Sequence, residues 1–247
     1  MPAIRASSLS STRIAGLIYL AIITLGIFGE VFVRGSLVVS GNASSTATSI
    51  LASQTLWRSG IATDLLMHVL DAPLIVFFYL LLRPVSKPLA LLATALNVVQ
   101  TCVLAANKLS LVAALLMLQR SVSATAVSPQ DLHDLAYVAI NLHGYGFGVG
   151  LIFFGFACLI RGYLIFNSDF VPRIFGVLLA IAGVCYVINS FALLLSPNLA
   201  AALFPAILLP ALVGELALSI WLLLTKYKLG NQVPLSLSNS IASPSGA

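Results

Sequence analysis

The chain has 247 residues, of which 60% are hydrophobic and only 8% are charged, and its mean hydropathy is +1.08. Soluble domains carry about 25% charged residues, so this composition excludes a soluble globular protein and indicates an integral membrane protein. The net charge of +5 does not indicate nucleic-acid binding, because the Lys and Arg residues stand singly at the ends of apolar runs, where membrane topology places them.

Six apolar segments are long enough to cross a bilayer, since a hydrocarbon core of about 30 Å needs about 20 helical residues. These runs are continuous, which favours helices over the alternating strands of a membrane barrel. The predicted fold is therefore an all-α polytopic transmembrane helix bundle. In chain order, the predicted spans are residues 13–33, 57–82, 89–118, 135–165, 174–195 and 203–225.

The distribution of basic residues predicts that both termini are cytoplasmic. With a cytoplasmic N-terminus, eight Lys and Arg residues near the span ends lie inside, and three, Arg34, Arg58 and Arg120, lie outside. We expect residues 1–11 to form a polar tail and residues 12–228 to form one transmembrane domain. The Ser-rich and Asn-rich residues 229–247 are expected to be disordered.

Local residues mark where several helices begin, bend or pack. Ser128 followed by Pro129 is typical of a helix N-terminus, with Ser128 as the N-cap. The glycines at 144, 146, 148 and 150 form two pairs with a spacing of four, which favours close packing of the fourth span against a neighbour.

Three ionisable side chains lie close together in the second predicted span. At 100° per residue along a helix, Asp64, His68 and Asp71 fall within an arc of about 60° and form one stripe. Ionisable groups at membrane depth are costly, so this stripe indicates a binding site, a proton pathway or a buried ion network. We expect the helix to kink beside the stripe at Pro73, which has no backbone donor.

The third predicted span carries a matching set of polar residues on a face about 120° wide. Lys108 on this face is the expected countercharge for Asp64 or Asp71. We therefore predict a polar cavity in the outer half of the membrane, lined by the second and third spans. The residues assigned to this cavity, or to a ligand or proton pathway within it, are Glu30, Asp64, Asp71, Asn97, Gln100, Asn107, Lys108 and Glu215.

Three functions fit these residues. The leading hypothesis is a protein that handles a small molecule, an ion or protons through the polar cavity. A second hypothesis is a metal-dependent membrane hydrolase that uses the stripe of Asp64, His68 and Asp71. In it Asp64 and His68 bind zinc, with His143, Asp71 or Glu215 as a further ligand, and the metal activates water. A third is a structural or regulatory protein, in which the buried charges fix the helix register. Whether the protein is an enzyme is left open, and the expected partners are the lipid bilayer and a small ligand or ion.

Much of the chain resembles the membrane family called domain of unknown function 4386. The resemblance covers about residues 10–226, and it is most specific in the R-x-x-G-x-x-Y-L pattern at 13–20 and in "GYLIFNSDFVPRIFG" at 162–176. It implies a multi-pass protein of the bacterial inner membrane. It supplies no catalytic residues, because the family has no established activity. By this resemblance, the family's motif positions fall at Glu30, Arg34, Arg58, Asp64 and Glu215.

Overall fold

The computed structural model describes residues 11–122 and 127–225, and it confirms an all-α fold with six helical segments long and apolar enough to cross a membrane. The predicted tails, apart from residue 11, lie outside the described residues. The first span consists of α1 (Ser11–Ile27), the π-helix η1 (Phe28–Arg34) and α2 (Gly35–Leu37). The other spans are α4 (Gln54–Leu82), α5 (Lys87–Ser121), α6 (Pro129–Phe166), α7 (Arg173–Leu195) and α9 (Leu209–Leu224), the last preceded by the short η2 (Ala206–Leu208).

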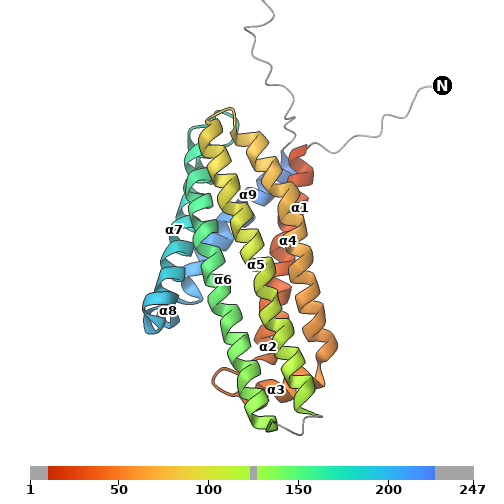
Figure 1. Cartoon of the computed structure of the whole chain (residues 1–247). Helices are drawn as coiled ribbons and strands as arrows, with labels where there is room; N and C mark the ends of the chain where they lie inside the picture. The colour runs from red at the N-terminus through yellow and green to blue at the C-terminus, as the bar shows by residue number, and fades with distance from the viewer. Residues whose placement is uncertain (1–10, 123–126, 226–247) are drawn as a thin grey trace, which may run out of the picture.

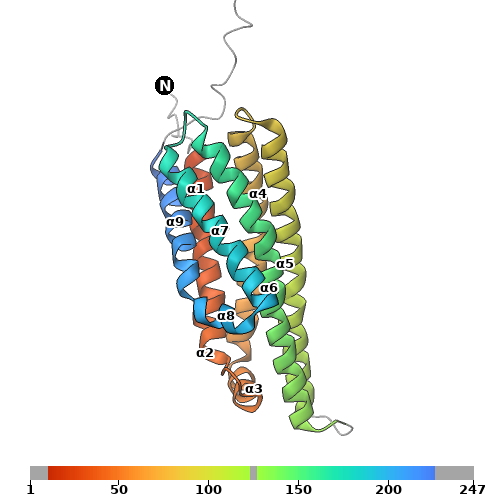
Figure 2. The same ribbon diagram turned by 90° about the vertical axis from the view of Figure 1, so that its left-hand side faces the viewer.

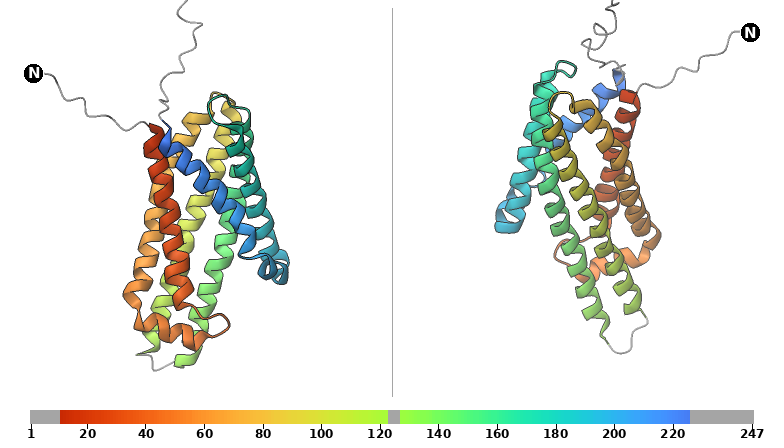
Figure 3. Two further views of the ribbon diagram at one scale, coloured as in Figure 1. Left: turned by 180° about the vertical axis from the view of Figure 1, so that it is seen from behind. Right: turned by 45° about the horizontal axis from the view of Figure 1, so that its top comes forward.

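The six spans lie together as an elongated bundle (Figure 1), and the contacts between them close into a ring. Each span packs against the spans before and after it in sequence, and α1 also packs against α9. Both views in Figure 3 show α1 and α9 side by side at one end of the bundle. There the Thr12 hydroxyl donates to the Thr225 carbonyl at 2.9 Å. We call this the terminal end, and we call the opposite end, which carries α3 (Ala43–Ala52), the loop end.

The spans differ in length, and this difference shapes the loop end. α5 and α6 have 35 and 38 residues, whereas α7 has 23. At 1.5 Å per residue, α5 and α6 therefore extend roughly 20 Å beyond α7. The short helix α8 (Pro197–Leu203) turns across the end of α7 and leads into α9 (Figure 2). On the side of the bundle formed by α7 and α9, the short elements α8 and η2 therefore stand where α5 and α6 continue as long helices.

The outer surface of the bundle is apolar, as a lipid-facing surface requires. Val69, Leu109 and Leu195 expose 66%, 69% and 80% of their surface. A large cluster of buried apolar side chains lies nearer the terminal end, where Phe78 packs edge-on against Tyr19 and Phe77. This arrangement places large hydrophobic side chains on both sides of each helix, which is typical of a membrane bundle.

The predicted start of α6 agrees with the structure. The Ser128 side chain accepts a hydrogen bond from the Asp131 amide at 3.1 Å, and Pro129 begins α6. α4 continues through Pro73 without a break, and the kink expected there stays a prediction. The π-helix η1 was not predicted. π-Helices are rare and occur often at functional sites, so η1 makes the region around Glu30 and Arg34 a candidate functional site.

Glycines bring α6 and α7 into close contact at two levels. A Cβ added to Gly162 would lie 2.7 Å from the carbonyl oxygen of Gly176, and one added to Gly176 would lie 2.6 Å from that of Gly162. The same reciprocal contact joins Gly155 and Gly183, at 2.9 and 2.6 Å. The members of each pair are seven residues from the next pair along both helices. Small residues at this spacing allow membrane helices to approach backbone to backbone.

The predicted orientation can be tested by cysteine labelling in cells. If the terminal end is cytoplasmic, Thr48→Cys on α3 should react with a membrane-impermeant maleimide in intact cells. Ser86→Cys, in the turn between α4 and α5, should react only after permeabilisation. The wild-type chain is the control, because its described cysteines lie within the spans. The reverse labelling pattern would overturn the orientation.

Candidate functional site

An ion cluster lies in the half of the bundle nearer the loop end. Asp64 on α4 is 1% exposed, and its Oδ2 atom is 2.7 Å from Arg34 Nη1 and 2.9 Å from Lys108 Nζ. Arg34 also pairs through Nε with Glu30 Oε2 at 2.7 Å. With all four side chains ionised, the cluster contains two positive and two negative charges. It is therefore neutral, which is the condition for holding charges at low dielectric.

The π-helix places both Glu30 and Arg34 in this cluster. The two residues lie four positions apart in η1, and Arg34 reaches from there to Asp64 on α4. Gly29 makes room for this contact, because a Cβ at that position would collide with Asp64 Oδ1. The Oδ1 atom is buried and has no hydrogen-bond partner within the described part of the chain. The charge of Asp64 is thus balanced entirely through its other oxygen.

Two residues of α6 complete the cluster. Lys108 Nζ lies 3.1 Å from His143 Nε2, and the Asn107 amide donates to the His143 carbonyl at 2.8 Å. Asn107 fills the space beside Gly146, where a Cβ would meet its side-chain oxygen. His143 is 4% exposed, so this contact lies inside the bundle. The polar residues of α5 are therefore fixed against α6 as well as against α4.

A second polar group runs from α4 to α6 closer to the terminal end. His68 Nδ1 lies 3.2 Å from Asp71 Oδ2, which accepts a bond from Thr101 at 3.4 Å. Asn97 and Gln100 on α5 bond to each other at 2.6 Å. Asn97 also accepts from Arg161, whose guanidinium group lies over the Phe78 ring at 4.9 Å. We call His68, Asp71, Asn97, Gln100, Thr101 and Arg161 the inner polar group.

Glu215 lies apart from the ion cluster. Its Oε1 atom accepts a hydrogen bond from the Tyr186 hydroxyl at 2.5 Å, and Tyr19 is a second hydrogen-bonding neighbour. These residues come from α9, α7 and α1, which adjoin one another in the ring. Glu215 is 8% exposed and forms no ion pair within the described residues. It is a buried carboxyl group whose hydrogen-bond partners are hydroxyl groups.

A cavity of about 630 Å³ borders the ion cluster. It lies among η1, α6, the end of α7, α8 and η2, where the short elements leave the side of the bundle incomplete. Glu30 is the acidic residue of its wall, and 58% of the Glu30 side chain is exposed. Asn141, Tyr145 and Asn189 supply further polar groups, and most of the remaining wall is apolar. Gly144 also faces this space, since a Cβ there would meet no atom within 4 Å.

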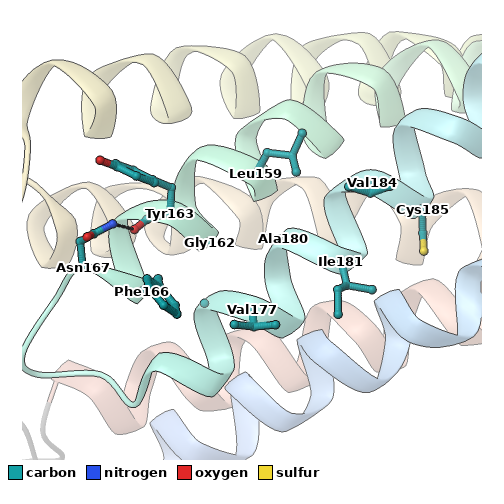
Figure 4. A pocket seen from close by; sticks show the side chains of 11 residues that line it. Leu159, Gly162, Tyr163, Phe166, Asn167, Val177, Ala180, Ile181, Val184 and Cys185 are labelled. Carbon is teal, nitrogen blue, oxygen red and sulfur yellow. Dashed lines mark hydrogen bonds between the residues drawn. The ribbon is translucent and has the colours of Figure 1, made fainter.

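A second cavity of about 640 Å³ is a groove between α6 and α7 near the terminal end. Figure 4 shows Tyr163 and Asn167 near one end of the groove and Val184 and Cys185 at the other. Asn167 donates to the Tyr163 carbonyl at 2.8 Å, so its amide is already occupied. The lining contains no Asp, Glu, Lys or Arg residue. The groove therefore suits a hydrocarbon chain of the bilayer better than a polar ligand.

The residues proposed as zinc ligands are not arranged as a metal site. Both neighbours of Asp64 Oδ2 are cations, and His143 Nε2 faces the Lys108 ammonium group. His68 pairs with Asp71 instead. Among residues 11–122 and 127–225, no group of three His, Cys, Asp or Glu side chains is close enough to hold a metal ion. Zinc does not fit these residues, and we derive no hydrolytic step from it.

The structure separates the residues that were predicted to line one cavity. Asp64 pairs with Lys108 as expected, and Glu30 joins them through Arg34. Glu30 alone among the predicted residues lines the cavity of 630 Å³, whose walls come from α6, α7 and α8 rather than from α4 and α5. The predicted residues that lie elsewhere are Asp71, Asn97 and Gln100 in the inner polar group, and Glu215 beside Tyr186.

The sequence interpretation missed two arginines that the structure makes central. Arg34 was counted as an external loop charge, but its side chain is only 11% exposed and pairs with Asp64. Arg161 was assigned to the membrane surface, but it is 5% exposed and bonds to Asn97. A signal for Arg34 was present in the sequence, because Glu30 and Arg34 have the spacing of a helical ion pair.

One family model matches most of the chain. The family described as Domain of unknown function (DUF4386) matches residues 14–225. An uncharacterized protein of Archaeoglobus fulgidus is 30% identical over 125 residues, which are 50% of this chain and 60% of that protein. The match thus covers less than two thirds of this relative's length. No solved structure matches the chain. The chain is a multi-pass membrane protein that belongs to the DUF4386 family.

Proposed function

We propose that the protein binds a small amphipathic molecule that carries a positive charge, in the cavity of 630 Å³ beside the ion cluster. The observation that carries this proposal is the position of Glu30. Glu30 lines the cavity, its side chain is 58% exposed, and its carboxylate is salt-bridged on one oxygen to Arg34. The other oxygen makes no hydrogen bond within the described residues, so it is free to accept one from a ligand.

The composition of the wall defines the class of ligand. Asn141, Tyr145 and Asn189 offer hydrogen bonds, while Ile140, Phe147 and other apolar residues form most of the surface. Ligand sites of 300–1,000 Å³ commonly combine an apolar wall with a few polar groups that fix orientation. An ammonium group at Glu30 and a hydrocarbon or aromatic body against the apolar wall would satisfy both parts.

The ion cluster gives this binding site a connection to the interior. A cation beside Glu30 competes with Arg34 for the same carboxylate, and Arg34 also holds the buried Asp64. Ligand binding would thereby change the balance of charges around Asp64 and Lys108. This coupling supports a role in small-molecule transport or sensing. We place this role in the cell membrane, and in the cytoplasmic membrane if the source is bacterial.

Binding can be tested with 4-phenylbutylammonium, which combines an aromatic ring with a cationic group. Calorimetry on the protein in nanodiscs should detect saturable binding, beyond the partitioning measured with empty nanodiscs. Glu30→Gln should weaken this binding about tenfold to hundredfold, because a hydrogen bond to a charged group contributes about 1.5–3 kcal/mol.

Two controls make this result specific. The uncharged analogue 4-phenylbutanol should bind wild type and Glu30→Gln equally. Asp134→Asn removes a carboxylate from the exposed start of α6, outside the cavity, and should leave the affinity for 4-phenylbutylammonium unchanged. Equal affinity of wild type and Glu30→Gln for the ammonium compound would contradict the proposal.

A structural role for the ion cluster is the second candidate, and the burial of Asp64 favours it. A carboxylate that is 1% exposed and shared by two cations joins η1, α4 and α5 at one point. Such a network fixes the relative positions of helices even where no ligand binds. The two roles are compatible, since only Glu30 of these residues lines the cavity.

A further inference from the structure

The charges nearer the terminal end do not balance, in contrast to the neutral ion cluster. Arg161 is buried, and it forms no ion pair within the described residues. Its guanidinium group contacts the Asn97 oxygen and the Phe78 ring. The carboxyl groups whose charges reach it are Asp71 and Glu215, together with the weaker acids Cys158 and Tyr19. The region therefore contains one permanent positive charge and two carboxyl groups.

The two carboxyl groups differ in their surroundings. Asp71 pairs with His68 at 3.2 Å and accepts a hydrogen bond from Thr101 at 3.4 Å. Glu215 has the hydroxyl groups of Tyr186 and Tyr19 as its hydrogen-bond partners. Glu215 thus lacks the ionisable partner that Asp71 has in His68.

The charged and titratable groups around Glu215 come from several helices. The titratable or charged groups that act on Glu215, or whose own charge it affects, are Tyr19 on α1, Asp71 on α4, Cys158 and Arg161 on α6, and Tyr186 on α7. The only permanent cation in this set is Arg161, so one positive charge stands against the two carboxyl groups of Asp71 and Glu215. A second negative charge at this depth in the membrane would be costly unless a proton cancels it.

We propose that Glu215 is a proton-binding site in the interior of the bundle, which takes up and releases one proton between the Tyr186 and Tyr19 hydroxyl groups. In the protonated state, Glu215 is a neutral carboxylic acid, and the charges of Asp71 and Arg161 cancel. Loss of the proton to water leaves a carboxylate and gives the region a net charge of −1. The two cavities described above are not lined by Glu215, Asp71 or Arg161.

Infrared spectroscopy can test this site without any knowledge of the ligand. The full-length protein in dodecyl maltoside micelles, whose detergent has no ester carbonyl group, should show the carbonyl stretching band of a protonated carboxylic acid at pH 5, and this band should weaken by pH 8. Exposed Asp and Glu side chains are largely ionised at pH 5 and above, and the difference between wild type and variant removes their remaining signal. Glu215→Gln should remove the band, whereas Glu30→Gln should leave it unchanged.

A second variant separates protonation from folding. Tyr186→Phe removes the hydrogen bond to Oε1 but keeps the aromatic ring against Phe154. The band should remain and move to higher frequency, because a carbonyl group with fewer hydrogen bonds has a stiffer bond. A band that persists in Glu215→Gln, or no band in the wild type, would overturn the proposal. This test is independent of the ligand site, since binding of 4-phenylbutylammonium at Glu30 could fail while the band is present.

Discussion

Replacing Asp64 with Ala should destabilise the protein by about 3–5 kcal/mol, the cost of leaving buried charges without a partner. Arg34 Nη1 and Lys108 Nζ lie 2.7 and 2.9 Å from the same Asp64 oxygen. Without that oxygen, two cations face each other inside the bundle, and only Arg34 keeps an acidic partner, Glu30, while Lys108 keeps the uncharged contact with His143. The change can be measured as the free energy of unfolding in detergent micelles.

A second substitution should restore much of this stability. Lys108→Met removes the cation that Asp64→Ala leaves alone and keeps a side chain of similar length. In the double variant the remaining pair, Glu30 and Arg34, is neutral again. A double-mutant cycle should therefore give a coupling energy within the range of about 0.5–3 kcal/mol seen for contacting residues.

The control for this prediction is Arg58→Ala, which removes an exposed cation that forms no ion pair within the described residues. It should change stability by less than about 0.5 kcal/mol. If Asp64→Ala were as stable as Arg58→Ala, the cluster would contribute nothing to the fold. If the double variant were less stable than both single variants, charge balance would not be the reason.

Replacing Gly162 with Ala should destabilise the contact between α6 and α7 by about 1–3 kcal/mol, as overpacking does in other cores. The added Cβ would lie 2.7 Å from the Gly176 carbonyl oxygen and 2.9 Å from the Ala180 backbone nitrogen. Both atoms belong to a helix backbone, so neither can move without shifting α7. Thermal unfolding in detergent should show a lower melting temperature.

Gly144→Ala is the matched control, because it makes the same change on the same helix. A Cβ at Gly144 meets no atom within 4 Å, so its melting temperature should be unchanged or higher, since Ala favours helix more than Gly does. The same change should reduce the space beside Glu30, and the affinity for 4-phenylbutylammonium should fall slightly. Equal melting temperatures for Gly162→Ala and Gly144→Ala would contradict the close-contact interpretation.

The helices were predictable because each has a signal within its own sequence. The length of the apolar segments predicts all six spans, and Ser128 followed by Pro129 predicts the start of α6. Periodicity also placed Asp64, His68 and Asp71 on one face of α4. It could not show which neighbours that face meets. Because Asp64 and Asp71 lie about 10 Å apart along the helix, they contact different partners and belong to different groups.

The parts that were not predicted depend on contacts between distant segments. Arg34 reaches Asp64 only because η1 departs from the α-helical geometry that periodicity assumes. Arg161 lies near the end of α6, where the sequence favours a surface charge, and only the packing of α4 and α5 shows that it is buried. The spacing of glycines within one span does not show which helix they contact. In the structure, Gly155 contacts Gly183 and Gly162 contacts Gly176, both on the next helix.

The closure of the ring by α1 and α9 has a consequence for how the protein is made. The hydrogen bond from Thr12 to Thr225 joins residues 213 positions apart. At a synthesis rate of about 5–20 residues per second, α1 waits roughly 10–40 s in the membrane before its neighbour leaves the ribosome. Tyr19 cannot meet Glu215 until then, so the interior carboxyl group is enclosed only at the last step of insertion. A chain that stops before α9 therefore lacks both the final wall of the ring and its proton-binding residue.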